Sequence, residues 1–287
     1  MKRLVVFLIT GMVLLSAGCA SNAPRPALRT RAIAVLQAGF SSEEFWPSMH
    51  AAEALTAAGL SDVVIRGLKP RLAVETDDQR RCGLSREIMR AGDLGPLAGM
   101  AKILKNPKTN APVHVCESLF KVHQVGDLAA MRQHAASENK SEALMAAGAL
   151  ARAGEKGELV RIRALLMPPH SLQTRRISAW LLGQLGDKSD WRALREFAES
   201  ATGSDEPLAA PFAWYALAKL GEPAAQKIVI ANLSNDNKTI RTYAAQTLGV
   251  YGAPKHLPLL AEMLEDETAD TRIRAAEAIV RITNRAR

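Results

Sequence analysis

Alanine-rich segments that end in leucine or isoleucine recur along this chain at intervals of about thirty-one residues. The run from Ala146 to Leu150, for example, has a counterpart from Ala244 to Leu248. A fixed period of this length indicates a repeat architecture. The large aliphatic residue of each segment, called the anchor here, defines eight units in one register: Leu55, Ile88, Leu119, Leu150, Leu182, Leu217, Leu248 and Ile279.

Two further columns share this register. Three positions before the anchor the residue is small in seven of eight units, and four positions after it the residue is glycine in six. Small residues one turn from a leucine let helices pack closely, and glycine supplies the left-handed cap that ends a helix. The six predicted cap residues are Gly59, Gly92, Gly154, Gly186, Gly221 and Gly252.

A second helix is predicted after each cap. Asp127, Glu158 and Asp190 each stand at the start of an apolar-periodic run, where an acidic residue favours a helix N-terminus. Each unit is therefore expected to be a helical hairpin. The predicted fold class is all-α, an α-solenoid (superhelix) of about eight hairpins.

The run from Ile240 to Gly252 resembles HEAT repeats, particularly the short kind found in phycobilisome lyases. The resemblance covers residues 43–287 and implies a HEAT-like repeat domain over that range. It implies a long curved surface that binds partners.

The first nineteen residues have the layout of an export signal. Lys2 and Arg3 precede about twelve apolar residues, which is too short for a membrane span, and small residues then precede Cys19. This end resembles a bacterial lipobox, although the family prefers leucine where Ser16 stands. We predict that residues 1–18 are a lipoprotein signal peptide and that Cys19 carries the lipid. Ordinary secretion, with cleavage after Ala23, is the alternative.

Residues 19–42 are predicted to form a tether, with a short capping helix over 32–38. Ala20 after the lipidated cysteine resembles the sorting pattern of outer-membrane lipoproteins. In a bacterium with two membranes, the protein is thus expected to be lipid-anchored in the cell envelope, at the outer membrane facing the periplasm.

The formal charge is +8, from 37 basic and 29 acidic residues, and falls to 35 − 29 = +6 when the signal is removed. This excess favours anionic partners only mildly, and nucleic-acid binding is not expected.

Three consecutive units place an arginine four or five residues into the second helix. Stacking would form a ladder of Arg132, Arg163 and Arg195, with Arg161 and Arg192 beside it. One interpretation is a basic stripe for an acidic partner. The other is structural: each arginine pairs with an acidic residue of its own or the adjacent unit. The sequence leaves both open.

Catalytic and metal-binding patterns are sparse. Cys82 and Cys116 are expected to be buried free thiols. His114, Cys116 and His123 lack the spacing of a metal site, so no metal is expected. Iron-binding HEAT enzymes that hydroxylate a lysine derivative carry His-Glu pairs, and none of the six histidines here precedes a glutamate.

The functional prediction is a non-catalytic, membrane-tethered scaffold for protein–protein interaction that faces the periplasm, with no cofactor. The alternative is an accessory lyase or chaperone-like factor that handles a chromophore or cofactor. A scaffold should show an open groove, whereas an enzyme should show a concave pocket with perturbed titratable groups.

Overall fold

The computed structural model describes residues 25–286, so the predicted signal peptide, Cys19 and the first part of the tether lie outside the described residues. Within this range the chain forms sixteen α-helices and four short 3₁₀ helices, and no strand. The predicted all-α solenoid is confirmed. None of the described helices is both long and apolar enough to cross a membrane.

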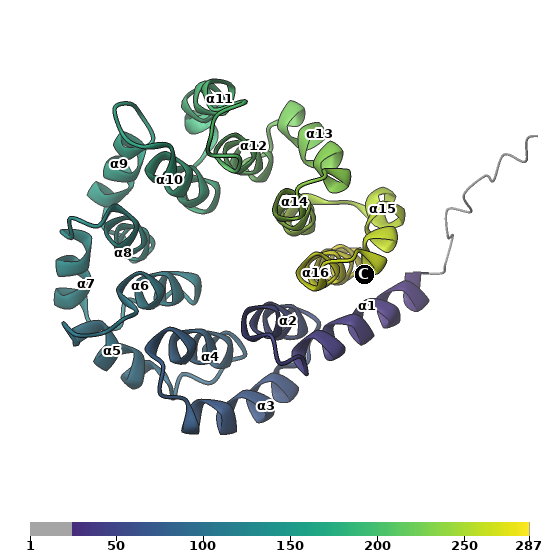
Figure 1. The fold of residues 1–287 in the computed structure, drawn as a ribbon, viewed down its shortest axis with the longest axis horizontal. Helices are drawn as coiled ribbons and strands as arrows, with labels where there is room; N and C mark the ends of the chain where they lie inside the picture. The colour runs from purple at the N-terminus through teal and green to yellow at the C-terminus, as the bar shows by residue number, and fades with distance from the viewer. Residues whose placement is uncertain (1–24, 287) are drawn as a thin grey trace, which may run out of the picture.

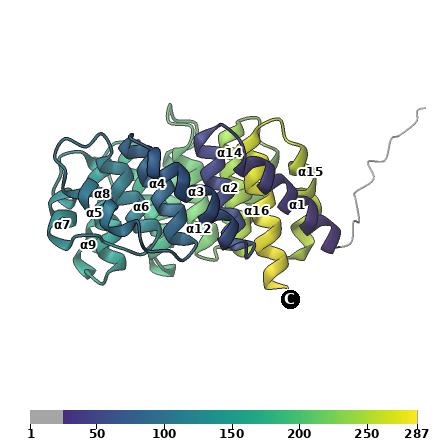
Figure 2. The ribbon, with the colours of Figure 1, turned by 90° about the horizontal axis from the view of Figure 1, so that it is seen from below.

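The hairpins stand side by side with one helix facing the centre and one facing outwards (Figures 1 and 2). The inner helices are α2 (Phe45–Ala57), α4 (Asp78–Arg90), α6 (Pro112–Lys121), α8 (Lys140–Arg152), α10 (Leu172–Leu185), α12 (Ala209–Lys219), α14 (Lys238–Tyr251) and α16 (Ala269–Arg285). The outer helices are α3 (Ser61–Val74), α5 (Leu97–Lys105), α7 (Leu128–Ala135), α9 (Lys156–Leu165), α11 (Trp191–Ser200), α13 (Pro223–Ala231) and α15 (Leu257–Glu262). Before them, α1 spans Arg25–Phe40, which is longer than the capping helix expected over 32–38.

The core lies between the inner and outer helices and follows the repeat register. All eight anchor side chains are fully buried. Glycines bring neighbouring inner helices close: a Cβ on Gly183 would lie 2.9 Å from Cα of Ala216, and one on Gly249 would lie 3.1 Å from Cα of Ala278. A side chain at either position would force the two helices apart.

The predicted left-handed caps are correct at four of six positions. Gly59, Gly92, Gly154 and Gly221 have φ values between 86° and 110°. The prediction is wrong at Gly186 and Gly252, whose φ values are −80° and −56°. Glycine is required there for space, because a Cβ would lie within 2.5–2.6 Å of the carbonyl oxygen four residues earlier.

The solenoid closes into a ring. Helices α1 and α2 pack against α16, so the first and last repeats meet at a contact that we call the seam (Figure 1). Asn284 donates a hydrogen bond to the carbonyl of Ala57 at 2.9 Å, and Arg274 forms an ion pair with Glu53 at 2.9 Å. Instead of the open groove expected of a scaffold, the described residues form a ring around a central cavity.

Candidate functional site

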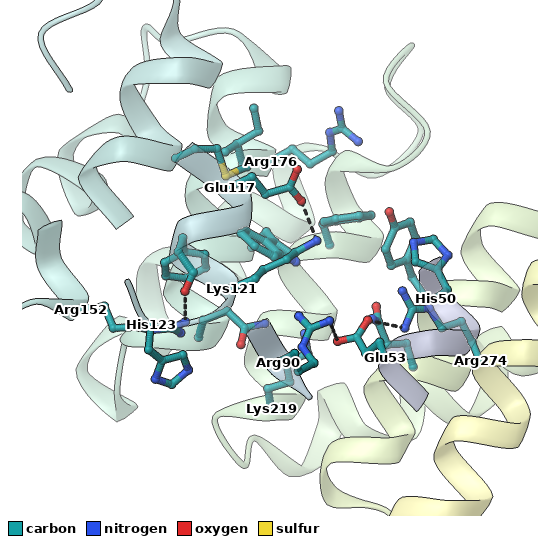
Figure 3. A pocket seen from close by; sticks show the side chains of 18 of the residues that line it. His50, Glu53, Arg90, Glu117, Lys121, His123, Arg152, Arg176, Lys219 and Arg274 are labelled. Carbon is teal, nitrogen blue, oxygen red and sulfur yellow. Dashed lines mark hydrogen bonds and ion pairs between the residues drawn. The ribbon is translucent and has the colours of Figure 1, made fainter. Parts of the chain in front are cut away.

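The ring encloses a cavity of about 530 Å³, to which all eight inner helices contribute side chains (Figure 3). Its wall is strongly cationic. Two carboxylates line it, Glu53 and Glu117, against seven basic side chains: Arg90, Lys121, Arg152, Arg176, Lys219, Arg274 and Arg281.

Five of these cations occupy the same place in their repeats. Two positions after the anchor stand Arg90, Lys121, Arg152, Lys219 and Arg281, which we call the basic column. Gln184 holds this position in the fifth unit and also lines the cavity. Four of its members, all but Arg281, lie in the last turn of an inner helix, where the helix dipole favours a positive charge. Because the repeats close into a ring, the five basic side chains are arranged around one central cavity.

Carboxylates compensate part of this charge. Glu53 pairs with Arg90 and Arg274 at 3.3 and 2.9 Å, and Glu117 pairs with Lys121 at 2.6 Å. Burial raises the pKa of both acids, but the nearby cations outweigh it. The pKa of Glu53 lies well below its usual range, held there by Arg90 and Arg274. Lys121 and Arg86 lower that of Glu117 to about 2. Both are ionised at neutral pH.

Two cations of the column have no carboxylate partner among the described residues. Arg152 donates to the carbonyl oxygen of Phe120 at 2.8 Å and stacks 3.9 Å from the centre of its ring. Lys219 has neither a hydrogen-bond acceptor nor an ion pair there. An aromatic ring or a carbonyl holds a cation in place without neutralising its charge.

Counting the charged side chains shows that the cavity wall carries a net positive charge. Five carboxylates contact the seven lining cations, so the balance is 7 − 5 = +2. These acids are Glu53, Glu87, Glu117, Glu206 and Glu277. Uncompensated positive charge in an enclosed space attracts an anion strongly, because the protein screens charge less than bulk water does.

The arginines predicted from the sequence lie elsewhere, on the outside of the ring. Each ladder arginine pairs with the acidic residue at the start of the next outer helix: Arg132 with Glu155, Arg163 with Asp190 and Arg195 with Glu222, at 2.8, 2.7 and 2.8 Å. Lys69–Asp93 and Lys105–Asp127 extend the series. These contacts agree with the structural interpretation of the ladder, and a role in binding a partner stays a prediction.

The two flanking arginines are also engaged. Arg161 donates to the carbonyls of Ala135 and Ala143 at 2.7 and 3.1 Å, which ties α9 to its neighbours. Arg192 pairs with Glu196 one turn away and is 90% exposed. Neither lies in the cavity wall.

The cysteines are buried free thiols, as predicted, and burial raises their pKa, to about 12 for Cys82. In residues 25–286 no three His, Cys, Asp or Glu side chains cluster as metal ligands would. His114 instead stacks on Trp46, with ring centres 5.6 Å apart.

The sequence did contain a signal for the cavity. Five of the eight units have a basic residue two positions after the anchor, nearly as many as the six with a cap glycine. The predicted ladder lies instead on the second helices. The closure that gathers the column into one site depends on the curvature summed over all repeats, and no single unit encodes that angle.

Comparison with known proteins supports the repeat assignment. Residues 202–280 match a model of HEAT repeats, and this match supports a HEAT-like repeat architecture. HEAT repeats commonly mediate protein–protein interaction. No curated protein matches the chain. The chain is similar to the solved structure of human deoxyhypusine hydroxylase in complex with glycerol, at 16% identity and a TM-score of 0.43, covering 90% of this chain and 98% of that one.

This similarity contradicts the prediction that the chain is not an enzyme, since the solved structure is that of an enzyme. A concave pocket with perturbed titratable groups was the feature expected of an enzyme, and the central cavity with Lys219 in its wall has that form. At this level of similarity, the activity of the solved enzyme cannot be assigned to this chain.

Proposed function

We propose that this protein binds an anionic ligand of small-molecule size inside the ring. The observation that carries the proposal is the basic column, which brings five cations to one cavity and leaves Arg152 and Lys219 without a carboxylate. The volume of about 530 Å³ lies within the range of small-ligand sites. A carboxylate or phosphate group would supply the missing negative charge.

The proposal also includes the cellular location of the protein. A lipid on Cys19 would hold the ring at the outer membrane, facing the periplasm, with residues 20–24 as the leading part of the tether. The support is the lipobox-like end of the signal. Fractionation of cells that express full-length protein or the Cys19→Ala variant tests this: the native chain should sediment with membranes and the variant should not.

Exposed apolar residues on the outer helices support a second proposal, that the protein also binds a protein partner. Val74, Leu128 and Val160 are apolar, belong to α3, α7 and α9, and are 80%, 42% and 64% exposed. A partner docked there would leave the cavity free, so the interaction scaffold and the ligand site are compatible. Of the two functions considered from sequence, the handling of a bound small molecule fits an enclosed cavity better than a scaffold alone.

The binding test uses the full-length chain and calorimetric titration with malonate, phosphate and, as a neutral control, glycerol. We expect the two anions to bind and glycerol not to bind. Arg152→Gln and Arg281→Gln should each weaken anion binding about tenfold or more, the scale of one charge-assisted contact. Arg132→Gln and Arg192→Gln are matched controls on the outer surface. Equal effects from both pairs of variants, or no binding of either anion, would overturn the proposal.

A further inference from the structure

Lys219 differs from the rest of the basic column in its surroundings. It is the last residue of α12 and lines both the central cavity and a narrow recess beside it (Figure 3). Its stem lies along α10, with Cδ 3.7 Å from where a Cβ on Gly183 would stand. Four aromatic residues share the wall of the recess: Trp180, Phe212, Tyr215 and Tyr243.

The nitrogen of this side chain forms no ion pair with any of the described residues. The other four cations of the column each contact a carboxylate or, for Arg152, a backbone carbonyl, while Lys219 contacts no acceptor among the described residues. An ammonium group in this position is both partly desolvated and close to other cations. Both effects favour the neutral amine.

The pKa of Lys219 accordingly falls to about 8. Burial is the main cause, and the charges of Lys121 on α6 and Arg274 on α16 add to it, while Glu277 and Glu53 oppose it. A lysine with such a pKa is partly unprotonated near neutral pH, and a neutral lysine amine is a nucleophile toward carbonyl groups.

We propose that Lys219 captures an anionic aldehyde or oxo acid as a reversible imine. The inference rests on the proposed binding of anions in the cavity and adds that the ligand carries a carbonyl carbon. Lys121 and Arg281 of the same column would attract its carboxylate or phosphate.

The step is balanced without any co-reactant. The lone pair of Nζ attacks the carbonyl carbon, and one of the two amine protons passes to the carbonyl oxygen, which becomes a hydroxyl group. That hydroxyl takes up a proton from solvent and leaves as water, the nitrogen returns its second proton to solvent, and a C=N bond replaces C=O. Nothing is oxidised or reduced. Water reverses the reaction, so the ligand is held and released rather than consumed.

The test treats the full-length chain with glyoxylate, the smallest oxo acid, and traps the imine with borohydride. Peptide mass mapping should locate one reduced adduct, on Lys219. Its yield should rise with pH around a midpoint near 8, the pKa given above, whereas an ordinary lysine would keep rising toward pH 10. Modification spread over exposed lysines such as Lys188, without an excess at Lys219, would overturn the inference.

Two variants separate loss of the nucleophile from loss of the fold. Lys219→Arg keeps the positive charge and should still bind malonate, yet give no adduct. Lys188→Met removes an exposed lysine outside the cavity wall and should still give the adduct on Lys219. Malonate has no aldehyde or ketone, so it tests the anion site alone. If malonate binds but glyoxylate gives no adduct, the imine is refuted and the anion site stands. If malonate does not bind, the proposed function fails as well.

Discussion

Nδ1 of His50 and Oδ1 of Asp270 lie 2.6 Å apart, although 220 positions separate the two residues along the chain. The contact crosses the seam from α2 to α16, beside the ion pair between Glu53 and Arg274. The first and last repeats thus share a partly buried polar interface at the edge of the cavity. Because this interface contains a histidine, its strength should depend on pH.

Acid should weaken the seam. Burial is the main cause that lowers the pKa of His50 below its usual 6.5, and Arg274 adds to it while Asp270 opposes it. The unfolded chain therefore binds this proton more readily than the folded chain does. The stabilisation is present above pH 6.5 and is lost as pH falls through 6.5 toward the lower folded value.

The measurement is the urea midpoint of unfolding at pH 7.5 and at pH 5.5. The urea midpoint of the native protein should be lower at pH 5.5 than at pH 7.5. The difference between the two midpoints should be smaller for His50→Gln. Equal falls in both proteins would show that His50 does not carry the effect.

Glu53 should be a large contributor to stability. It forms ion pairs with Arg90 of α4 and Arg274 of α16, both of which are largely buried. Glu53→Gln leaves these cations with less negative charge and should lower the free energy of unfolding by about 3 kcal/mol, as when one partner of a buried pair is removed. Glu265→Gln is the matched control: it removes the exposed seam pair with Arg31 and should cost under about 1 kcal/mol. Equal losses would contradict the assignment of the buried pairs as the main polar contact of the seam.

The outer ladder should respond according to the burial of each acid. Asp190 and Glu222 are 5% and 6% exposed, whereas Glu155 is 30% exposed. Arg163→Gln and Arg195→Gln should each lower the free energy of unfolding by about 1–3 kcal/mol, the scale of a buried acceptor left unpaired. Arg132→Gln should change it by under about 1 kcal/mol.

The same three variants test the ladder as a partner-binding surface. Crosslinking on native membranes should capture an unchanged set of proteins with each variant if the ladder is structural. A loss of one partner from all three, with the fold intact by circular dichroism, would instead establish the basic stripe as a binding surface.

The two kinds of glycine should differ in what they tolerate. Gly59 has a φ of 86° and open space around it, so Gly59→Asn should be mild, since asparagine accepts the left-handed region. Gly186 has an ordinary φ, but a Cβ there would lie 2.5 Å from Oδ2 of Asp190. Gly186→Ala should therefore lower the thermal midpoint more than Gly59→Asn. The reverse order would contradict the space requirement.

Thiol labelling can report on the lipid. Cys82 and Cys116 are fully buried and should react with a thiol reagent only after denaturation. A lipid on Cys19 would block the third thiol, so the native chain should show no fast-reacting thiol. One fast-reacting thiol, absent from Cys19→Ala, would refute lipidation.

The repeat register was readable from the sequence because packing imposes it on every unit in the same way. Leu150, Leu248 and the other six anchors are all buried because each packs between the inner and outer helices at the same place in its repeat. The caps were less predictable: Gly154 and Gly186 occupy the same column, but the first is needed for its backbone angle and the second for space. The site was not predicted, because Glu53 meets Arg274 only after the small rotations between all repeats add up to a closed turn.

Closure also gives the number of repeats a meaning that it lacks in an open solenoid. An open array can gain or lose a unit by duplication or deletion, because each unit contacts only its neighbours. Here one extra unit of about thirty-one residues would part Asn284 from Ala57 and change the circumference around the basic column. The number of units thus sets the circumference of the cavity, and a change in that number would require the seam to form anew between different repeats.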